Sequence, residues 1–401
     1  MTIATGITKS VAYNKETTYG VLANPVGAKY LRRTKSDFNL KKAIFSSAEL
    51  RTDYQVVDLR HGIRSADGVL DGEISPGSYS DFFAAGLSKD FVVGSSAAAV
   101  NLTTASSGLQ YTLTRSAGSY ITDGFRLGDV IRITAGTGLV ADNLNKNLQI
   151  TSLTALVATV AVLNSSTMTA GTSTSASLSV TGKKTFVPLT GHTSNSFTFE
   201  EFYSNIAQSE AYVGCKVNTL AVTLPSSGMA TLAVGFMGKD LAQTQSTQYF
   251  TTPTAQSTVG VTAGVNGVVV FNGNPIALIT QATINVTRNI TNADVIGSNS
   301  IADTFTGVAN VSGSFSMYFS DTTVRDAFNN ETEVSLIFSI ATGTGAAANF
   351  VSITMGRCKI NDFVQADVAL GIIASSNFVA LLPTSAGAAE QTTISIQDSL
   401  A

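Results

Sequence analysis

The sequence predicts an all-β protein, and three observations lead to this fold class. Charged residues make up 13% of the 401 residues, against about 25% in ordinary globular proteins, too few for the solvent-facing sides of a helical bundle. The chain contains 34 glycines and many Ser and Thr, which favour turns and exposed strand positions. Apolar residues make up 44% and recur in short alternating runs, so the chain can bury a large core in strands. This apolar content excludes a disordered chain.

The sequence contains no pattern typical of a membrane span, a secretory leader or a disulfide framework. No run of about 18 apolar residues, the length of a membrane-spanning helix, occurs. Residues 1–20 lack the apolar stretch of a secretory signal, and two Cys cannot build a disulfide framework. We therefore expect a soluble protein without a membrane span that is made in the cytoplasm.

Charge is distributed unevenly along the chain. Residues 1–90 carry 12 basic and 10 acidic side chains, so their net charge is +2. Residues 92–182 carry four basic and three acidic side chains (+1), and residues 183–401 carry eight and 14 (−6). No basic cluster is present that could neutralise a phosphate backbone, so tight binding of nucleic acid is not expected.

An internal similarity predicts two related domains in tandem. The segment VLDGEIS at 69–75 matches NVSGSFS at 310–316 with a spacing of 241 residues, which pairs Gly72 with Gly313. Self-similarity in this order is the signature of a duplicated unit.

Each of these segments is followed by a pattern that predicts a short flanking helix. Apolar residues at i, i+3 and i+4 mark one helical face. They are Phe83, Gly86 and Leu87 in the first copy and Val324, Ala327 and Phe328 in the second. Ser80 and Ser320 are the expected N-cap residues.

A second match has a different spacing. GCKVNTLAV at 214–222 matches RCKINDFVQ at 357–365, 143 residues later, and superimposes the chain's two cysteines, Cys215 and Cys358. The two spacings differ by 241 − 143 = 98 residues, which a domain inserted into the first copy explains.

A further match, of LAVGF at 232–236 with VALGI at 368–372, completes the division of the chain. The expected segments are an N-terminal extended arm (1–34), a first repeat (35–91 and 183–243), an inserted domain (92–182), an inter-repeat connection (244–277) and a second repeat (278–401).

The inserted segment has a pattern of its own. Residues 92–182 hold 7 charges in 91 residues, in short alternating apolar runs separated by Gly, Asn, Ser and Thr. The runs GDVIRIT and NLQITSLT have the rhythm of a compact barrel of five or six strands. We expect a small β-barrel that decorates the surface and could fold alone.

Candidate chemical sites are few, and each has a structural explanation that we favour. GTGLVA at 136–141 fits a dinucleotide fingerprint, but ADNLNKN follows it where a helix would be needed, so a β-turn is expected. His61 and His192 are expected to be surface side chains. Cys215 and Cys358 lack C-x-x-C spacing and are expected to be buried core residues rather than zinc ligands. We predict no catalytic, cofactor-binding or metal-binding residues and no cofactor.

The segments KETTYGVLA (15–23), YLRRTKSDFNLKKAIFSSAELR (30–51) and RHGIRSADGVLDGEISPGSYSDFFAAGL (60–87) resemble the N-terminal part of phage major tail tube proteins. The resemblance is to the siphophage type with a duplicated tube domain, and the inserted domain is similar to decorations of such proteins. It implies tandem β-sandwich or barrel domains, each with a flanking helix.

The resemblance also implies a function. Such a chain builds stacked rings, here homotrimers that form pseudo-hexamers, around a channel that genomic DNA passes through during ejection. Its partners are other copies of itself, a tape measure protein and tail tip or terminator proteins. Its location is the virion tail, after assembly in the host cytoplasm. The arm at 1–34 is then expected to order on the adjacent ring by β-augmentation.

Two other classes of function remain open from the sequence. A glycan-binding adhesin or virion decoration would be β-rich too, although the absence of Trp counts against sugar platforms. A secreted carbohydrate-active enzyme would need a convergent acidic cleft, for which the dispersed Asp and Glu give no support.

Overall fold

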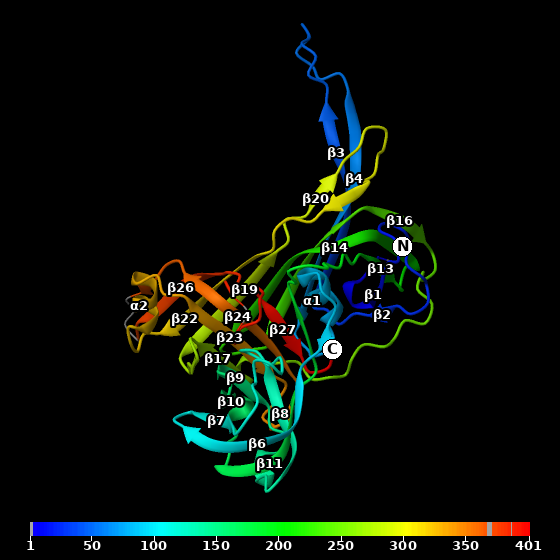
Figure 1. The fold of residues 1–401 in the computed structure, drawn as a ribbon. Helices are drawn as coiled ribbons and strands as arrows, with labels where there is room; N and C mark the ends of the chain where they lie inside the picture. The colour runs from blue at the N-terminus through cyan, green and yellow to red at the C-terminus, as the bar shows by residue number, and fades with distance from the viewer. Residues whose placement is uncertain (1–2, 367–370, 386) are drawn as a thin grey trace.

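The computed structural model describes residues 3–366, 371–385 and 387–401 and confirms the all-β class. Its chain forms two β-rich halves that lie side by side, a barrel that packs against them and a long hairpin that projects away from them (Figure 1). One continuous hydrophobic core runs through both halves, while the barrel has a core of its own.

The first half consists of two sheets packed face to face, with one helix beside them. One sheet has the order β2-β1-β13-β14-β16 and the other has the order β3-β4-β15-β14, so the long strand β14 belongs to both. Its elements are β1 (Lys9–Lys15), β2 (Lys29–Tyr30), β3 (Lys35–Ser46), β4 (Leu59–Glu73), α1 (Ser80–Leu87), β13 (Phe197–Tyr203), β14 (Gln208–Pro225), β15 (Thr231–Gly238) and β16 (Asp240–Gln245).

Aromatic rings fill the space between these two sheets. The ring of Phe199 on β13 lies 4.6 Å from that of Phe38 on β3 and 4.7 Å from that of Phe236 on β15. Phe82 of α1 joins this cluster at 5.5 Å from Phe236. Buried aromatic residues contribute large apolar areas, so this cluster is a main source of the first half's stability.

The second half has the same order of strand pairing. One sheet has the order β18-β17-β23-β24-β27 and the other has the order β19-β22-β26-β24, with β25 extending the line of β24 beside β26. Its elements are β17 (Gly267–Phe271), β18 (Asn274–Pro275), β19 (Ile279–Thr287), β22 (Asn310–Tyr318), α2 (Thr323–Asn329), β23 (Val334–Ala341), β24 (Phe350–Ile360), β25 (Val364–Ala366), β26 (Ile373–Ala380) and β27 (Ser395–Asp398). A small hairpin of β20 (Thr291–Ala293) and β21 (Asp303–Phe305) lies between β19 and β22.

Two strand pairings join the parts of the chain. β14 of the first half pairs antiparallel with β19 of the second, from Thr219 opposite Thr287 to Pro225 opposite Gln281. In addition, β12 (Lys183–Phe186) pairs antiparallel with β27 of the second half. The β14–β19 pairing gives a single shared sheet with the order β3-β4-β15-β14-β19-β22-β26-β25, which runs through both halves.

The barrel is closed and has six strands, where the alternating pattern predicted five or six. Its strands follow the order β10-β7-β6-β11-β8-β9. They are β6 (Ser96–Ser107), β7 (Gln110–Arg115), β8 (Val130–Thr137), β9 (Leu148–Leu153), β10 (Val157–Val162) and β11 (Gly171–Val180). The chain enters through β5 (Val92–Val93) and leaves through β12 (Lys183–Phe186), which pair with each other. The segment from residue 88 to 196 therefore occupies the place of the short turn 330–333 in the second half.

The matched residues of the two halves occupy similar environments. Cys215 lies opposite Phe197 in the β13–β14 pair and Cys358 lies opposite Val334 in the β23–β24 pair. Both cysteines are buried and free, as predicted. Gly72 and Gly313 each lie beneath an aromatic ring, of Tyr79 and Phe378 respectively, where a Cβ would collide.

The expected helices are present, but the predicted N-cap residues, Ser80 and Ser320, are wrong: the N-caps are Tyr79 and Thr322. Helix α1 begins at Ser80, whose hydroxyl donates to the buried carboxylate of Asp398 (3.1 Å) instead of capping the helix. Helix α2 begins at Thr323, whose backbone N–H is bound by Asp321 (2.9 Å) rather than by Ser320. Phe328 is partly exposed, whereas the other five predicted face residues are buried.

The expected N-terminal arm (1–34) and the expected inter-repeat connection (244–277) both contain strands of the fold. Residues 9–15 form β1, which pairs with β13 of the same chain, so these residues are not part of a free arm. Likewise, residues 267–271 of the expected connection form β17 in the second half. In the third sequence match, residues 367–370 lie outside the described residues, and the strand beside β24 is β26.

Candidate functional site

The residues weighed for chemistry do not form a site. His61 on β4 and His192 in a loop are both exposed and far apart in the chain. Burial raises the pKa of the Cys358 thiol to about 12 and that of the Cys215 thiol well above its usual range, so both thiols are inert. GTGLVA contains the end of β8 and a turn before a short 3-10 helix, Ala141–Asn143.

Within residues 3–366, 371–385 and 387–401, no group of three or more His, Cys, Asp or Glu side chains is placed to hold a metal ion. Over the same residues, no helix is long and apolar enough to cross a membrane.

The exposed face of the shared sheet is a polar surface. Along each strand, alternate residues point away from the core, and their register partners on neighbouring strands lie on the same face. On β19, β22 and β26 most of these residues are polar and uncharged, and the larger Tyr318 is exposed at the end of β22. The polar ones include Gln281, Thr283, Asn285, Thr287, Ser312, Ser314, Ser316, Ser375 and Asn377.

Most charges on this face lie on β3 and β4, and Lys359 of β24, opposite Val379, lies on it too. On β3 and β4, two cations and four carboxylates lie on this face, a net charge of −2, and Lys35 pairs with Asp37 at 2.7 Å. They are Lys35, Lys41, Asp37, Asp67, Asp71 and Glu73. A face with few cations makes few attractive contacts with phosphate groups, so a nucleic acid beside it would not be held.

The β3–β4 hairpin projects from the body of the molecule (Figure 1). It exposes apolar side chains. Exposed residues at its end include Ile44, Phe45, Leu50, Tyr54 and Val56. An exposed apolar group of this size is typical of an interaction surface.

The β20–β21 hairpin lies beside the base of this projection. The backbone N–H of Arg64 on β4 donates to the carbonyl of Asn299 (2.8 Å), and the side chain of Arg64 forms an ion pair with Asp240 (2.7 Å). Ile296 and Phe305 of the small hairpin are exposed too. Both halves thus present apolar side chains near one end of the molecule.

The two ends of the shared sheet are unpaired among the described residues. β3 pairs only with β4, and β25 pairs only with β26. In the middle of the sheet, by contrast, β19 is paired on both sides, with β14 and β22. Open strand edges present free backbone N–H and C=O groups, which another strand can bind.

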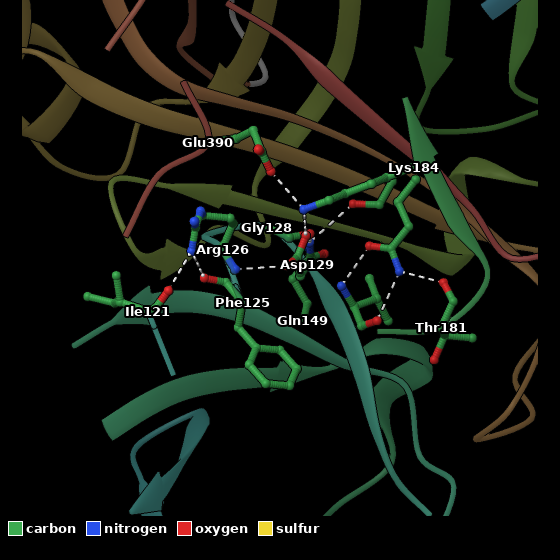
Figure 2. Close-up of polar contacts among 12 residues, drawn as sticks. Ile121, Phe125, Arg126, Gly128, Asp129, Gln149, Thr181, Lys184 and Glu390 are labelled. Atoms are coloured by element: carbon green, nitrogen blue, oxygen red, sulfur yellow. Dashed lines mark hydrogen bonds and ion pairs between the residues drawn. The ribbon is translucent and has the colours of Figure 1, made fainter. Parts of the chain in front are cut away.

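The barrel is fixed to the second half by a buried polar junction (Figure 2). Lys184 on β12 forms ion pairs with Asp129 of the barrel (3.3 Å) and with Glu390 of the second half (2.7 Å). Burial opposes the charge of Lys184, but the two carboxylates outweigh it and raise its pKa, so Lys184 is charged at neutral pH. Burial raises the pKa of Asp129.

Two glutamines complete this junction. The side chain of Gln149 on β9 donates to the carbonyl of Gly128 (3.0 Å) and to the hydroxyl of Ser352 on β24 (3.2 Å). Gln397 on β27 contacts the backbone of Val130 and the carbonyl of Thr181 (2.6 Å). Beside them lies a small apolar cluster of Val130, Leu163, Ala341 and Phe350. The barrel is therefore inserted into the first half but docked on the second.

Sequence reasoning missed these surfaces for identifiable reasons. The Ser and Thr of β19 and β22 alternate with apolar residues, which predicts strands but does not say what their polar side faces. The partners of Gln149 and Gln397 are distant in sequence, at Ser352 and Val130, so no local pattern marks either glutamine as buried.

One comparison with known proteins found a match. A family model described as phage tail tube protein matches residues 6–395, nearly the whole chain. The comparison with curated proteins found no match.

Proposed function

The chain belongs to the phage tail tube protein family, and on this premise we propose that it polymerises as stacked rings into the tail tube of a siphophage-type virion. The family supports a structural role in the virion tail, without enzymatic activity. In the proposed tube, genomic DNA passes through the central channel on its way into the host.

The observation that carries this proposal is the seam between β14 and β19. It joins two halves of the same strand order head to tail in one sheet, and the sheet ends in two open edges. Repeating that junction between copies closes a ring, and closed rings are the expected outcome of head-to-tail interfaces. Three copies with two halves each supply six units, so the proposed ring is a homotrimer with pseudo-six-fold symmetry.

We further propose that the two halves arose by duplication and that the barrel was inserted into the first copy. Matching strand order, matching helices after β4 and β22, and the equivalent pairing of Cys215 and Cys358 support it. The insertion point after α1 corresponds to the short turn after α2.

The exposed face of the shared sheet is the proposed channel wall. Its hydroxyl and amide side chains present no cation over β19, β22 and β26, and the six charges that β3 and β4 place on this face sum to −2. Each contact of a Lys or Arg with phosphate adds a salt-dependent binding energy, so a basic wall would retain the DNA. An uncharged wall lets it slide.

The projecting hairpins are the proposed contacts between successive rings. Exposed Phe45 and Leu50 on the β3–β4 hairpin, and Phe305 on β21, would be covered by the next ring. Residues 3–8, which include exposed Ile3 and Ile7 and precede β1, are the part of the expected arm that could contribute there. The remaining proposed partners are a tape measure protein and tail tip or terminator proteins. The proposed place of assembly is the host cytoplasm.

Electron microscopy of the purified chain tests the proposal. Negative staining should show hollow rings or tubes, with rings of three copies by mass. Monomers or globular trimers without a channel, at protein concentrations up to those reached in an infected cell, would refute it.

A further inference from the structure

Three charged side chains meet at the base of the barrel, largely out of contact with water. The amine Nζ of Lys184 lies 3.3 Å from Oδ1 of Asp129 and 2.7 Å from Oε2 of Glu390 (Figure 2). The three side chains are 10%, 6% and 22% exposed, respectively. Among the residues that the structure describes, Lys184 is the only lysine paired with carboxylates of two residues. One carboxyl group can therefore react with the amine while the other holds a proton.

The carboxyl group of Asp129 is oriented for attack by this amine. Its Oδ2 accepts a hydrogen bond from the backbone N–H of Arg126 (2.8 Å), while its Oδ1 contacts the amine. The guanidinium of Arg126 binds the carbonyls of Ile121 (2.9 Å) and Phe125 (2.8 Å) instead of the carboxylate. A backbone N–H on Oδ2 stabilises the negative charge that develops on this oxygen when a nucleophile adds to the carboxyl carbon.

Burial favours the uncharged forms that such a reaction needs. It raises the pKa of Asp129 in spite of the nearby Lys184. Lys184 is charged in the resting state, because its two carboxylates outweigh its burial. Transfer of a proton from the amine to a carboxylate turns this ion pair into a neutral pair, which a buried site favours more than water does. The neutral amine is a nucleophile.

We propose that Lys184 and Asp129 condense into a side-chain amide (isopeptide) bond within the folded chain. The Nζ–Cγ bond forms, the Cγ–Oδ1 bond breaks, and Oδ2 remains as the carbonyl oxygen of the amide. Oδ1 leaves as water with two protons from the amine, one of them relayed by Glu390. Atoms and charge balance, because an ammonium and a carboxylate give one neutral amide and one water. The reaction takes place once in each chain and needs no other reagent.

The fold supplies the conditions for this condensation. Asp129 directly precedes β8, Lys184 lies on β12 and Glu390 belongs to the second half, so only the folded chain brings the three together. Groups held in contact react as if their concentration were about 10⁵ M or higher, and a buried site keeps out the water that would reverse the reaction. The bond closes a loop of residues 129–184 and ties the barrel covalently to β12, which pairs with β27.

Mass spectrometry of the full chain tests the proposal. The purified protein should be lighter than its sequence by one water. After tryptic digestion, residues 127–132 should be joined to residues 184–216 in one branched peptide, because trypsin does not cleave after an acylated lysine. Loss of water at an Asp-Gly pair would not join these two peptides. Recovery of only the separate peptides 127–132 and 185–216, after prolonged incubation of the folded protein, would overturn the inference.

Three variants separate the amide bond from ion pairing. Lys184→Arg keeps the positive charge, but a guanidinium stays protonated and is not nucleophilic at neutral pH, so this variant should fold and keep its full sequence mass. Asp129→Ala removes the carboxyl group that reacts and should also keep its full mass. Glu390→Gln removes the proton relay and should form the bond at least about a hundredfold more slowly. Equal rates in Glu390→Gln and the wild type would overturn the role of Glu390.

A second lysine provides an internal control in every sample. Nζ of Lys146 lies 3.2 Å from Oδ1 of Asp142, but the side chain of Asp142 is 60% exposed. This pair should remain an ion pair, so trypsin should cleave fully after Lys146. Linkage at Lys146 as frequent as at Lys184 would show that contact alone suffices and would overturn the role of the buried triad. The experiment does not require rings, so its outcome is independent of the proposed function.

Discussion

Gln397 on β27 forms two hydrogen bonds with the backbone of Val130, the first residue of β8 in the barrel. The Val130 N–H donates to Oε1 (2.8 Å) and the Val130 carbonyl accepts from Nε2 (2.9 Å). Both residues are buried, and the amide is the partner of the Val130 N–H, while the Val130 carbonyl also accepts from the backbone N–H of Thr181 (2.9 Å). One side chain of the C-terminal strand therefore binds directly to the backbone of the barrel.

Substituting Gln397 by Leu should loosen the barrel. Leu has a similar volume but removes the partner of the Val130 N–H and of the Thr181 carbonyl, at a cost of about 1–3 kcal/mol for each unsatisfied group. The Val130 carbonyl still accepts from the Thr181 N–H (2.9 Å). Hydrogen exchange of β8 and β27 should accelerate while the aromatic core of the first half stays protected. Gln243→Leu, a surface glutamine that contacts only Gln245, is the matched control. Equal protection in both variants would contradict the docking role.

Alkaline pH should destabilise the native chain above pH 9. Burial raises the pKa of Cys358 from 9.0 to about 12 and that of Tyr79 from 10.0 to about 12. Both groups keep their proton in the native state, so their contribution is fully present below the unfolded pKa values. It is lost as the pH rises towards about 12, because the unfolded chain ionises first.

Urea unfolding at pH 8 and pH 10.5 measures this effect. The midpoint should fall for the wild type and fall less for Cys358→Val, which removes the thiol and costs roughly 1 kcal/mol in packing at either pH. An identical pH dependence of the two proteins would show that Cys358 makes no contribution.

The sequence predicted strands where one side of the strand is solvated, and it failed where both sides are covered. β22 alternates buried Val311 and Phe315 with exposed positions, which is why NVSGSFS stands out. In β1, Val11, Ala12 and Tyr13 are buried in succession. Ala12 faces Phe250 in a second small cluster, while Val11 and Tyr13 face the main core. Because buried and exposed residues do not alternate along this strand, the sequence pattern does not mark it, and sequence analysis places residues 9–15 in an extended arm.

The candidate surfaces were less predictable than the fold. The scarcity of charge pointed to a channel-forming surface only through the family resemblance, because composition does not tell which face a charge occupies. The strand register was needed to place the Ser and Thr of β19, β22 and β26 on one face. The docking of the barrel on the second half depends on contacts between residues about 200 positions apart, such as Gln149 and Ser352.

Deleting the barrel should leave a chain that still polymerises but is less stable. A short Gly/Ser bridge can replace residues 95–181, because Val93 and Lys183 lie opposite each other in the β5–β12 pair. The deletion uncovers Phe350, whose exposure costs on the order of 2 kcal/mol. Thermal unfolding and electron microscopy measure the two effects, and Phe350→Ser in the deleted chain should restore solubility if uncovered apolar surface causes any aggregation. A folded, soluble deletion variant that forms no rings would show that the barrel takes part in assembly.

Polar substitutions at the hairpin tip should separate ring formation from stacking. Leu50→Ser with Tyr54→Ser changes two exposed side chains that contact nothing in the monomer core, so folding should be unaffected. If the tip docks on the next ring, the variant should give rings but short tubes or none. Gln55→Ala at the same tip is the control and should give tubes of normal length. Tubes of equal length in both variants would exclude the tip from stacking.

Counting protrusions on the tube should distinguish a trimer from a hexamer. Each chain supplies two halves of similar strand order, but only the first half contains an insertion, and the single barrel docks on the second half of the same chain. A ring of three chains therefore has six halves and three barrels. Because the junction with Lys184, Gln149 and Gln397 is buried, each barrel should keep a fixed orientation and remain visible after averaging. Cryo-electron microscopy of assembled tubes should show three protrusions per ring with three bare positions between them. Six equal protrusions would mean that each chain fills one position, and the trimeric ring would then be wrong.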